Sequence, residues 1–136
     1  MRPGLRSGTG RERETAGDSG ERVSRFCSAL VAKKALDVTV LDISALSSVA
    51  DAFIVASAYS RLAVQALADG VREAARAAGD RPLRSEGESE GRWICLDFGD
   101  IVVHLFLDEV RRYFDLERLW GDAPARRFEL PPAATG

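Results

Sequence analysis

The stretch that most constrains the fold is RWICLDFGDIVVHLFLDEVRRYFDLERLW, residues 92–120, in which two apolar segments meet at Gly99-Asp100. Glycine accepts the positive φ that the first central position of a type II′ turn requires, so this pair predicts a two-residue β-hairpin turn. The resulting register pairs Phe98 with Ile101, Leu96 with Val103, and Ile94 with Leu105. One side of the hairpin is then wholly apolar. The inference depends on the turn, because a slip of one residue would exchange the two faces.

The other side of the hairpin mixes aromatic, imidazole, thiol and carboxylate groups. Its members are Trp93, Cys95, Asp97, Val102, His104 and Phe106. A strand that is buried on both faces is usually almost continuously aliphatic. The mixed face is therefore typical of a surface that meets a partner, and interfaces are enriched in Trp, Tyr and Arg. The alternative is that the aromatic rings of this region complete a small core.

The remaining elements follow from apolar spacing and end signals. An apolar stripe predicts a helix from Glu21, and Ser60 is placed to cap a long helix that Gly79 ends. Asp108 is placed to cap a short helix after the hairpin. The predicted strands are Val38–Ile43, Ala52–Ser57, a short edge strand near Pro82–Ser85, and the two strands of the hairpin. This order predicts an α/β or α+β domain with a mixed β-sheet flanked by helices.

The length of 136 residues predicts one folded domain with an extension at each end. Residues 1–20 hold five glycines and almost no large apolar side chain, so we expect a disordered N-terminal extension. Residues 21–123 form the predicted domain. Residues 124–136 are rich in proline and alanine, and we expect a flexible C-terminal tail.

The net charge, the length of the apolar runs and the spacing of the cysteines indicate which partners and which cellular compartment to expect. The net charge of −2 argues against general electrostatic binding to nucleic acid. No apolar run approaches the roughly 18 residues that a membrane span needs, and the N-terminus lacks the apolar segment of a secretory signal. The two cysteines, Cys27 and Cys95, show no spacing typical of a disulfide framework. We therefore expect a cytoplasmic protein with reduced thiols and no membrane partner.

The longest motifs resemble one known family. GRWICLDFGDIVVHLF followed by RRYFDLERLWGDAP, and upstream LDISALSSVADAFIVASAYSRLAVQALAD, closely resemble the ribosomal silencing factor family, also called the Iojap-like family. The resemblance covers about residues 21–124. It implies a mixed sheet related to nucleotidyltransferases, a homodimer, and no enzymatic activity.

The resemblance also implies a partner and a mechanism. Proteins of this family bind ribosomal protein L-fourteen on the joining face of the large ribosomal subunit, and they sterically block the small subunit. The partner-binding residues that the resemblance implies here are Trp93, Asp97, Phe98, Asp100, His104, Tyr113 and Phe114. Two positions depart from the family pattern. The family usually has Tyr at the position of Phe114, and Gly at the position of Ala58.

The alternative function is a nucleotidyltransferase-like enzyme or nucleotide-binding protein. That chemistry needs paired carboxylates that hold metal ions against a triphosphate. Asp97 and Asp100 flank the hairpin turn and need not converge, whereas Asp42 and Asp51 flank a loop without a Gly-Ser phosphate-binding step. Cys95 and His104 form a possible nucleophilic pair, but they are too few for a structural zinc site. We therefore expect no catalytic residue, no metal and no cofactor.

Overall fold

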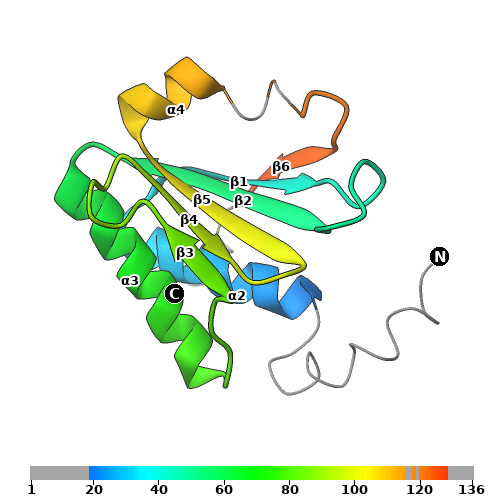
Figure 1. Cartoon of the computed structure of the whole chain (residues 1–136), viewed down its shortest axis with the longest axis horizontal. Coiled ribbons are helices and arrows are strands. Elements are labelled where there is room, and N and C mark those ends of the chain that lie inside the picture. Colours follow the sequence, from blue (N-terminus) through cyan, green and yellow to red (C-terminus); the bar gives the residue numbers. More distant parts are fainter. Residues whose placement is uncertain (1–18, 116–117, 119, 129–136) are drawn as a thin grey trace, which may run out of the picture.

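A six-stranded mixed β-sheet organises the computed structural model, which describes residues 19–115, 118 and 120–128 (Figure 1). The strand order is β3-β4-β5-β2-β1-β6. The central pair, β2 and β5, is parallel, and every other neighbouring pair is antiparallel. Helices α2 and α3 lie on one side of the sheet and α4 on the other. The predicted mixed sheet flanked by helices is confirmed.

The elements follow the predicted order with small shifts of their ends. They are α2 (Ser19–Ala32), β1 (Leu36–Asp42), β2 (Ala52–Ala58), α3 (Arg61–Ala77), β3 (Arg84–Glu86), β4 (Trp93–Asp97), β5 (Ile101–Leu107), α4 (Asp108–Phe114) and β6 (Ala125–Arg127). None of these helices is long and apolar enough to cross a lipid bilayer.

The β4–β5 hairpin has the predicted turn and register. Gly99 adopts φ 93°, and the backbone N–H of Phe98 donates to the carbonyl of Ile101 at 2.8 Å. Leu96 pairs with Val103, and Cys95 pairs with His104. The Asp97 carboxylate accepts a hydrogen bond from the Gly99 N–H at 2.8 Å and so braces the turn. Turn chemistry that is local in the sequence therefore determines which face each hairpin residue occupies.

The apolar face of the hairpin joins the larger of two cores. This core packs the sheet against α2 and α3 and includes Phe26, Leu30, Ile54, Val64, Leu67, Val71, Ile94, Leu96, Val103 and Leu105. The smaller core lies on the opposite face under α4, and includes Leu41, Ile43, Val55, Phe106 and Val110. The mixed face of the hairpin belongs to this second side.

Helix α3 begins and ends at the predicted signals. The Ser60 hydroxyl accepts a hydrogen bond from the Ala63 N–H, as an N-cap does. At the other end, Gly79 has φ 76°, and the N–H groups of Gly79 and Asp80 donate to the carbonyls of Arg76 and Ala75. This pair of bonds is a Schellman motif, which needs a residue that tolerates positive φ.

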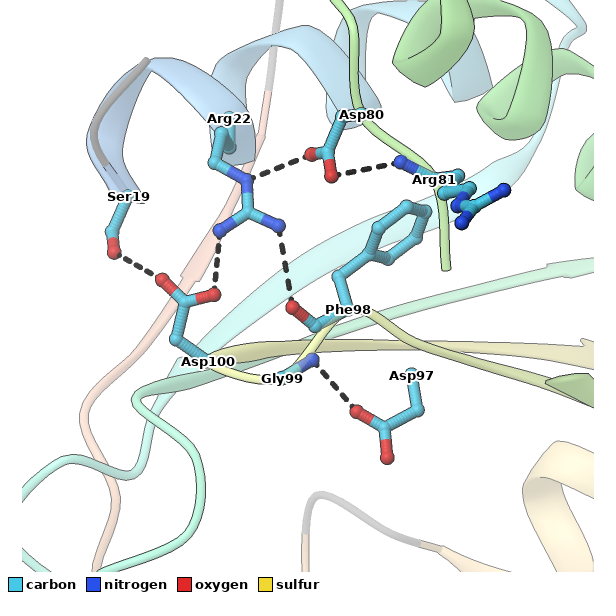
Figure 2. A network of polar contacts seen from close by, with 8 residues as sticks. All are labelled: Ser19, Arg22, Asp80, Arg81, Asp97, Phe98, Gly99 and Asp100. Carbon is cyan, nitrogen blue, oxygen red and sulfur yellow. Dashed lines mark hydrogen bonds and ion pairs between the residues drawn. The ribbon is translucent and has the colours of Figure 1, made fainter. Parts of the chain in front are cut away.

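Arg22 connects three elements that are distant in the sequence (Figure 2). Its guanidinium donates to Asp80 at 3.0 Å, to Asp100 at 2.5 Å and to the Phe98 carbonyl at 3.3 Å. The Ser19 hydroxyl also donates to Asp100, at 2.8 Å. Both Arg22 and Asp100 are buried. The network therefore ties α2 to the hairpin turn and to the loop after α3.

Two local predictions are wrong. Residues 125–127, expected in a flexible tail, form β6 and pair with β1, because the backbone of this segment completes the free edge of the sheet. Asp108 is the first residue of α4 rather than its cap; the cap is Leu107, which makes no side-chain cap bond. The Asp108 carboxylate instead accepts a hydrogen bond from Ser57. A third difference lies at the N-terminus: Ser19 and Gly20, expected in the disordered extension of residues 1–20, are the first residues of α2. Residues 1–18 of that extension and residues 129–136 of the tail lie outside the described residues.

Substitution of Gly87 and of Gly70 by alanine should affect the free energy of unfolding in different ways. A Cβ on Gly87, which has φ 86°, would lie 2.0 Å from the carbonyl oxygen of Trp93, so Gly87→Ala forces backbone to move. A Cβ on Gly70, inside α3, would meet only the flexible side chain of Lys33, at 3.1 Å. We expect Gly87→Ala to lower the free energy of unfolding by about 1–3 kcal/mol. Gly70→Ala should leave it unchanged or raise it by up to about 1 kcal/mol. Urea unfolding of both variants checks this, and equal responses would contradict it.

Candidate partner-binding face

A row of contacting rings crosses the sheet on the side of α4. We call it the aromatic row; its members are Tyr113, Phe114, Trp93, Phe106, His104, Phe53 and Trp120. Phe114 lies 4.9 Å from Trp93, and Trp93 lies 4.8 Å from Phe106, between ring centroids. His104 lies 4.7 Å from Phe53, which meets Trp120 edge-on at 5.4 Å. Tilted and edge-to-face contacts of this kind stabilise one another beyond their burial.

The most exposed part of the aromatic row lies at the α4 end. Tyr113 is 83% exposed and Phe114 is 50% exposed, while Trp93 is half-buried beside them. Helix α4 ends directly after Phe114, where Asp115 adopts the left-handed conformation with φ 50°. Three rings from two elements thus meet at one place on the surface. Such a group of aromatic side chains is typical of the anchors of a protein interface.

His104 lies beneath these three rings and is hydrogen-bonded to Trp93. Its Nδ1 accepts a hydrogen bond from the Trp93 indole N–H at 3.1 Å. The imidazole is 8% exposed, and its Nε2 has no hydrogen-bond partner among the described residues. Burial lowers the pKa of His104 from 6.5 to about 4, against a smaller opposing effect of Asp97. The ring is therefore neutral at pH 7 and is able to accept the indole proton.

The structure separates the seven predicted partner-binding residues into two sets. Trp93, His104, Tyr113 and Phe114 belong to the aromatic row, and Asp97 lies on the same face of β4. Phe98 and Asp100 do not join them. Phe98 is 5% exposed and packs on Phe26, with ring centroids 4.5 Å apart. Asp100 is bound by Arg22 (Figure 2). Whether these residues bind a partner is still a prediction. The accessible surface of the first set comes from Tyr113, Phe114 and the half-buried Trp93 and Asp97, because His104 is itself buried.

Three members of the row, Phe53, Phe106 and Trp120, were not among the predicted site residues. Phe53 lies in the predicted strand Ala52–Ser57, and its half-buried ring lies between His104 and Trp120. Successive side chains of a strand point to opposite faces, so Phe53 lies on the α4 face of β2, next to Val102 of β5. The pairing of β2 with β5 brings Phe53 next to His104, and no local sequence pattern predicts that pairing.

Cys95 and His104 lie opposite each other, as predicted, but they are not poised for nucleophilic chemistry. Burial is the main cause that raises the pKa of the Cys95 thiol to about 11, so the thiol is protonated at pH 7. The Nδ1 of His104 already accepts the indole proton. A reactive cysteine needs a thiolate and a base that can take its proton. Within the described part of the chain, no group of three or more His, Cys, Asp or Glu side chains is arranged to hold a metal ion.

Three of the four carboxylates that could serve a nucleotidyltransferase accept structural hydrogen bonds. Asp97 binds the N–H of Gly99, and Asp100 binds Arg22. Asp42 and Asp51 both line a cavity of about 400 Å³ at the start of α2. The Asp42 carboxylate accepts hydrogen bonds from the backbone and hydroxyl of Ser44, which makes it a turn residue.

The lowered pKa of His104 predicts a loss of stability in mild acid. The unfolded chain takes up a proton near pH 6.5 and the folded chain only near pH 4, so stability is full above pH 6.5 and falls between these values. The loss that this group contributes is up to about 3 kcal/mol. His104 is the single histidine of the chain, so His104→Phe isolates its effect from that of the carboxylates. Urea unfolding from pH 7 to pH 4 should give a steeper decline for the wild type than for His104→Phe. Parallel curves would contradict the buried, neutral imidazole.

The sequence matches a known family and several of its members. Residues 16–135 match the family described as "Ribosomal silencing factor during starvation". The chain is 42% identical over 92 residues to the ribosomal silencing factor RsfS of Bacillus subtilis, covering 68% of this chain and 78% of that protein. It is 35% identical over 98 residues to the chloroplastic protein Iojap of Arabidopsis thaliana, covering 72% of this chain and 40% of that protein.

Solved structures share the fold. A crystal structure of a Chromobacterium violaceum protein superposes with a TM-score of 0.76 at 37% identity, covering 86% of this chain and 97% of that one. A crystal structure of a Bacillus halodurans protein superposes with a TM-score of 0.70 at 33% identity, covering 82% of this chain and all of that one.

Proposed function

The chain belongs to the ribosomal silencing factor family, and we propose that it represses translation by binding the large ribosomal subunit. The proposed partner on that subunit is ribosomal protein L-fourteen. The proposed mechanism is steric: the folded domain, once docked on the joining face, occupies space that the small subunit needs. No catalytic step, metal or cofactor enters this mechanism.

The observation that carries the proposal is the accessible end of the aromatic row. Trp93, Tyr113 and Phe114 present apolar area from two adjoining elements, β4 and α4. Trp and Tyr are among the residue types that most often supply the few large energetic contributions at protein interfaces. We therefore assign the affinity for the ribosomal protein to these three side chains.

Charged groups surround these anchors and would set the orientation of docking. Arg112 is exposed on α4 and pairs with Asp108 at 3.3 Å, one helical turn earlier. Arg92 and Glu109 are exposed beside them. Charges at the edge of an interface mainly affect the association rate and the selection of partners. We expect substitution of Arg92 or Arg112 to change the salt dependence of binding more than its affinity.

Phe98 and Asp100 have an internal role in this account. Phe98 fills the core beside Phe26, and Asp100 holds α2 through Arg22. Their contribution to binding would then be indirect, through the position of the hairpin that carries Trp93. Asp97 both braces the turn and lies on the binding face.

Co-sedimentation of the purified protein with isolated large subunits, small subunits and joined ribosomes tests the proposed partner. We expect retention by large subunits alone. Retention by small subunits, or by no particle, would refute the proposal. Loss of retention from large subunits stripped of ribosomal protein L-fourteen, and its return when that protein is restored, would identify the contact.

The alternative is a nucleotide-binding protein or nucleotidyltransferase-like enzyme. The arrangement of the hairpin carboxylates argues against it, because Asp97 and Asp100 are each engaged in structural hydrogen bonds on different sides of the turn. A thermal shift with nucleoside triphosphate and Mg²⁺ together, but with neither alone, would support this alternative.

We also propose that the protein is a homodimer in the cytoplasm, as the family resemblance implies. Sedimentation velocity over a range of concentrations should give twice the mass of one chain. A single species with the mass of one chain would contradict the dimer.

A further inference from the structure

We propose that His104 is a positioning residue that holds the Trp93 indole in the orientation a partner binds, and that the partner surface receiving Trp93 is apolar. The inference rests on the proposed function, because it assumes that Trp93 is an anchor. It adds the group that orients this anchor and the chemistry of the surface that receives it.

The imidazole of His104 is held firmly against the indole of Trp93. The indole N–H of Trp93 donates to Nδ1 of His104 at 3.1 Å, across the paired strands β4 and β5. Phe53 meets the imidazole edge-on at 4.7 Å, and Phe106 stacks with it at 6.3 Å. Strand β5 is hydrogen-bonded on both sides, to β4 and to β2. The acceptor therefore sits on a rigid strand inside packed rings, and it fixes the orientation of the one indole atom that can donate.

For stability alone, an apolar ring would suit this position better than His104. With Nδ1 acting as acceptor, the proton of the neutral ring is on Nε2, which is buried and has no partner among the described residues. A buried donor without an acceptor is destabilising, whereas an apolar ring of similar shape would avoid this. What an apolar ring could not provide is the acceptor for Trp93. The special contribution of His104 is therefore the hydrogen bond.

The consequence concerns the partner. Because the indole N–H is already bonded inside the protein, Trp93 offers a partner only its apolar ring surface. A carbonyl or carboxylate of the partner would find no donor there. The surface that receives Trp93 should therefore consist of aliphatic or aromatic side chains, while the exposed Tyr113 provides the polar contact at the edge.

Two variants separate the hydrogen bond from the packing. His104→Phe keeps a ring but removes the acceptor, whereas His104→Asn keeps an acceptor near the position of Nδ1 with less packing. We expect His104→Phe to unfold at the same temperature as the wild type or higher, yet to bind large subunits roughly fivefold to tenfold more weakly. His104→Asn should be less stable than His104→Phe, but it should bind large subunits more tightly than His104→Phe does.

Nuclear magnetic resonance of the free protein tests the hydrogen bond without any change to His104. The ¹⁵N resonances of the imidazole should show the Nε2–H form at pH 7. The indole proton of Trp93, identified by its persistence in Trp120→Phe, should exchange slowly with solvent. An Nδ1–H form, or rapid exchange of this proton, would overturn the proposal.

The outcomes also distinguish this inference from the proposed function. If the wild type binds no large subunits, the proposed function fails, while the resonances still decide whether His104 holds Trp93. If the wild type binds and His104→Phe binds equally well while folded, the positioning role is wrong even though the function stands. A gain in binding by a partner surface engineered with an acceptor opposite Trp93 would overturn the predicted apolar surface.

Discussion

Trp93→Glu should abolish retention by large ribosomal subunits while the protein stays folded. The indole is half-buried, and its ring contacts Phe106 and Phe114 on the binding face rather than the core beneath α3. Removing a central aromatic anchor typically costs at least about 2 kcal/mol of binding free energy, or roughly 30-fold in affinity. A carboxylate forced against an apolar surface adds a desolvation penalty. Co-sedimentation with large subunits measures the loss.

A matched control separates a local effect from a general one. Leu62→Glu makes the same kind of change at a side chain that is 78% exposed on α3, apart from the aromatic row. It should retain binding. Circular dichroism and urea unfolding should show that Trp93→Glu remains folded, with a loss of about 1–3 kcal/mol. Normal binding by folded Trp93→Glu would contradict the assignment of the interface.

Among the substitutions proposed here, Arg22→Met should lower the free energy of unfolding most, by about 3–5 kcal/mol. The substitution keeps the aliphatic length of the side chain but leaves Asp100 buried without the cation that it contacts at 2.5 Å. It also removes the bonds to Asp80 and to the Phe98 carbonyl. Urea unfolding at pH 7 measures the change. Because typical stabilities are only about 5–15 kcal/mol, a loss of this size should be visible in the thermal transition as well.

Arg76→Met provides the comparison, since Arg76 is an exposed arginine on α3. It should change stability by less than about 0.5 kcal/mol. A loss below about 1 kcal/mol for Arg22→Met at pH 7 would show that the network of Figure 2 contributes little to stability.

The parts of the fold that could be predicted are those with local causes. Gly99 determines the hairpin turn, and the turn determines which residues face the core. Ser60 and Gly79 determine the ends of α3 through their own side-chain or backbone chemistry. In each case the residues that interact lie within a few positions of one another, so the pattern in the sequence contains the whole interaction.

The parts that could not be predicted depend on distant partners. Phe98 and Asp100 stand at the hairpin turn, where exposure is the usual expectation, but Arg22 binds both from a helix more than 70 residues earlier. Strand β6 is only three residues long, and it forms because β1 offers it an edge. A local sequence pattern does not predict which distant segment of the chain will contact a given residue.

The candidate site was predictable to the same degree. Trp93, His104, Tyr113 and Phe114 lie within a short stretch of chain, and both their faces and their proximity follow from the hairpin and the helix after it. Phe53 comes from β2 and reaches His104 only through the parallel pairing of β2 with β5. The hydrogen bond between Trp93 and His104 also needed side-chain geometry, since the register alone places His104 opposite Cys95.

The rate and extent of subunit joining, followed by light scattering, test the central claim most directly. Large subunits are first mixed with the protein at a concentration that saturates binding, and small subunits are then added. The account predicts that the wild type lowers the fraction of joined ribosomes and that folded Trp93→Glu does not. Unchanged joining in the presence of saturating wild-type protein would contradict a steric silencing factor.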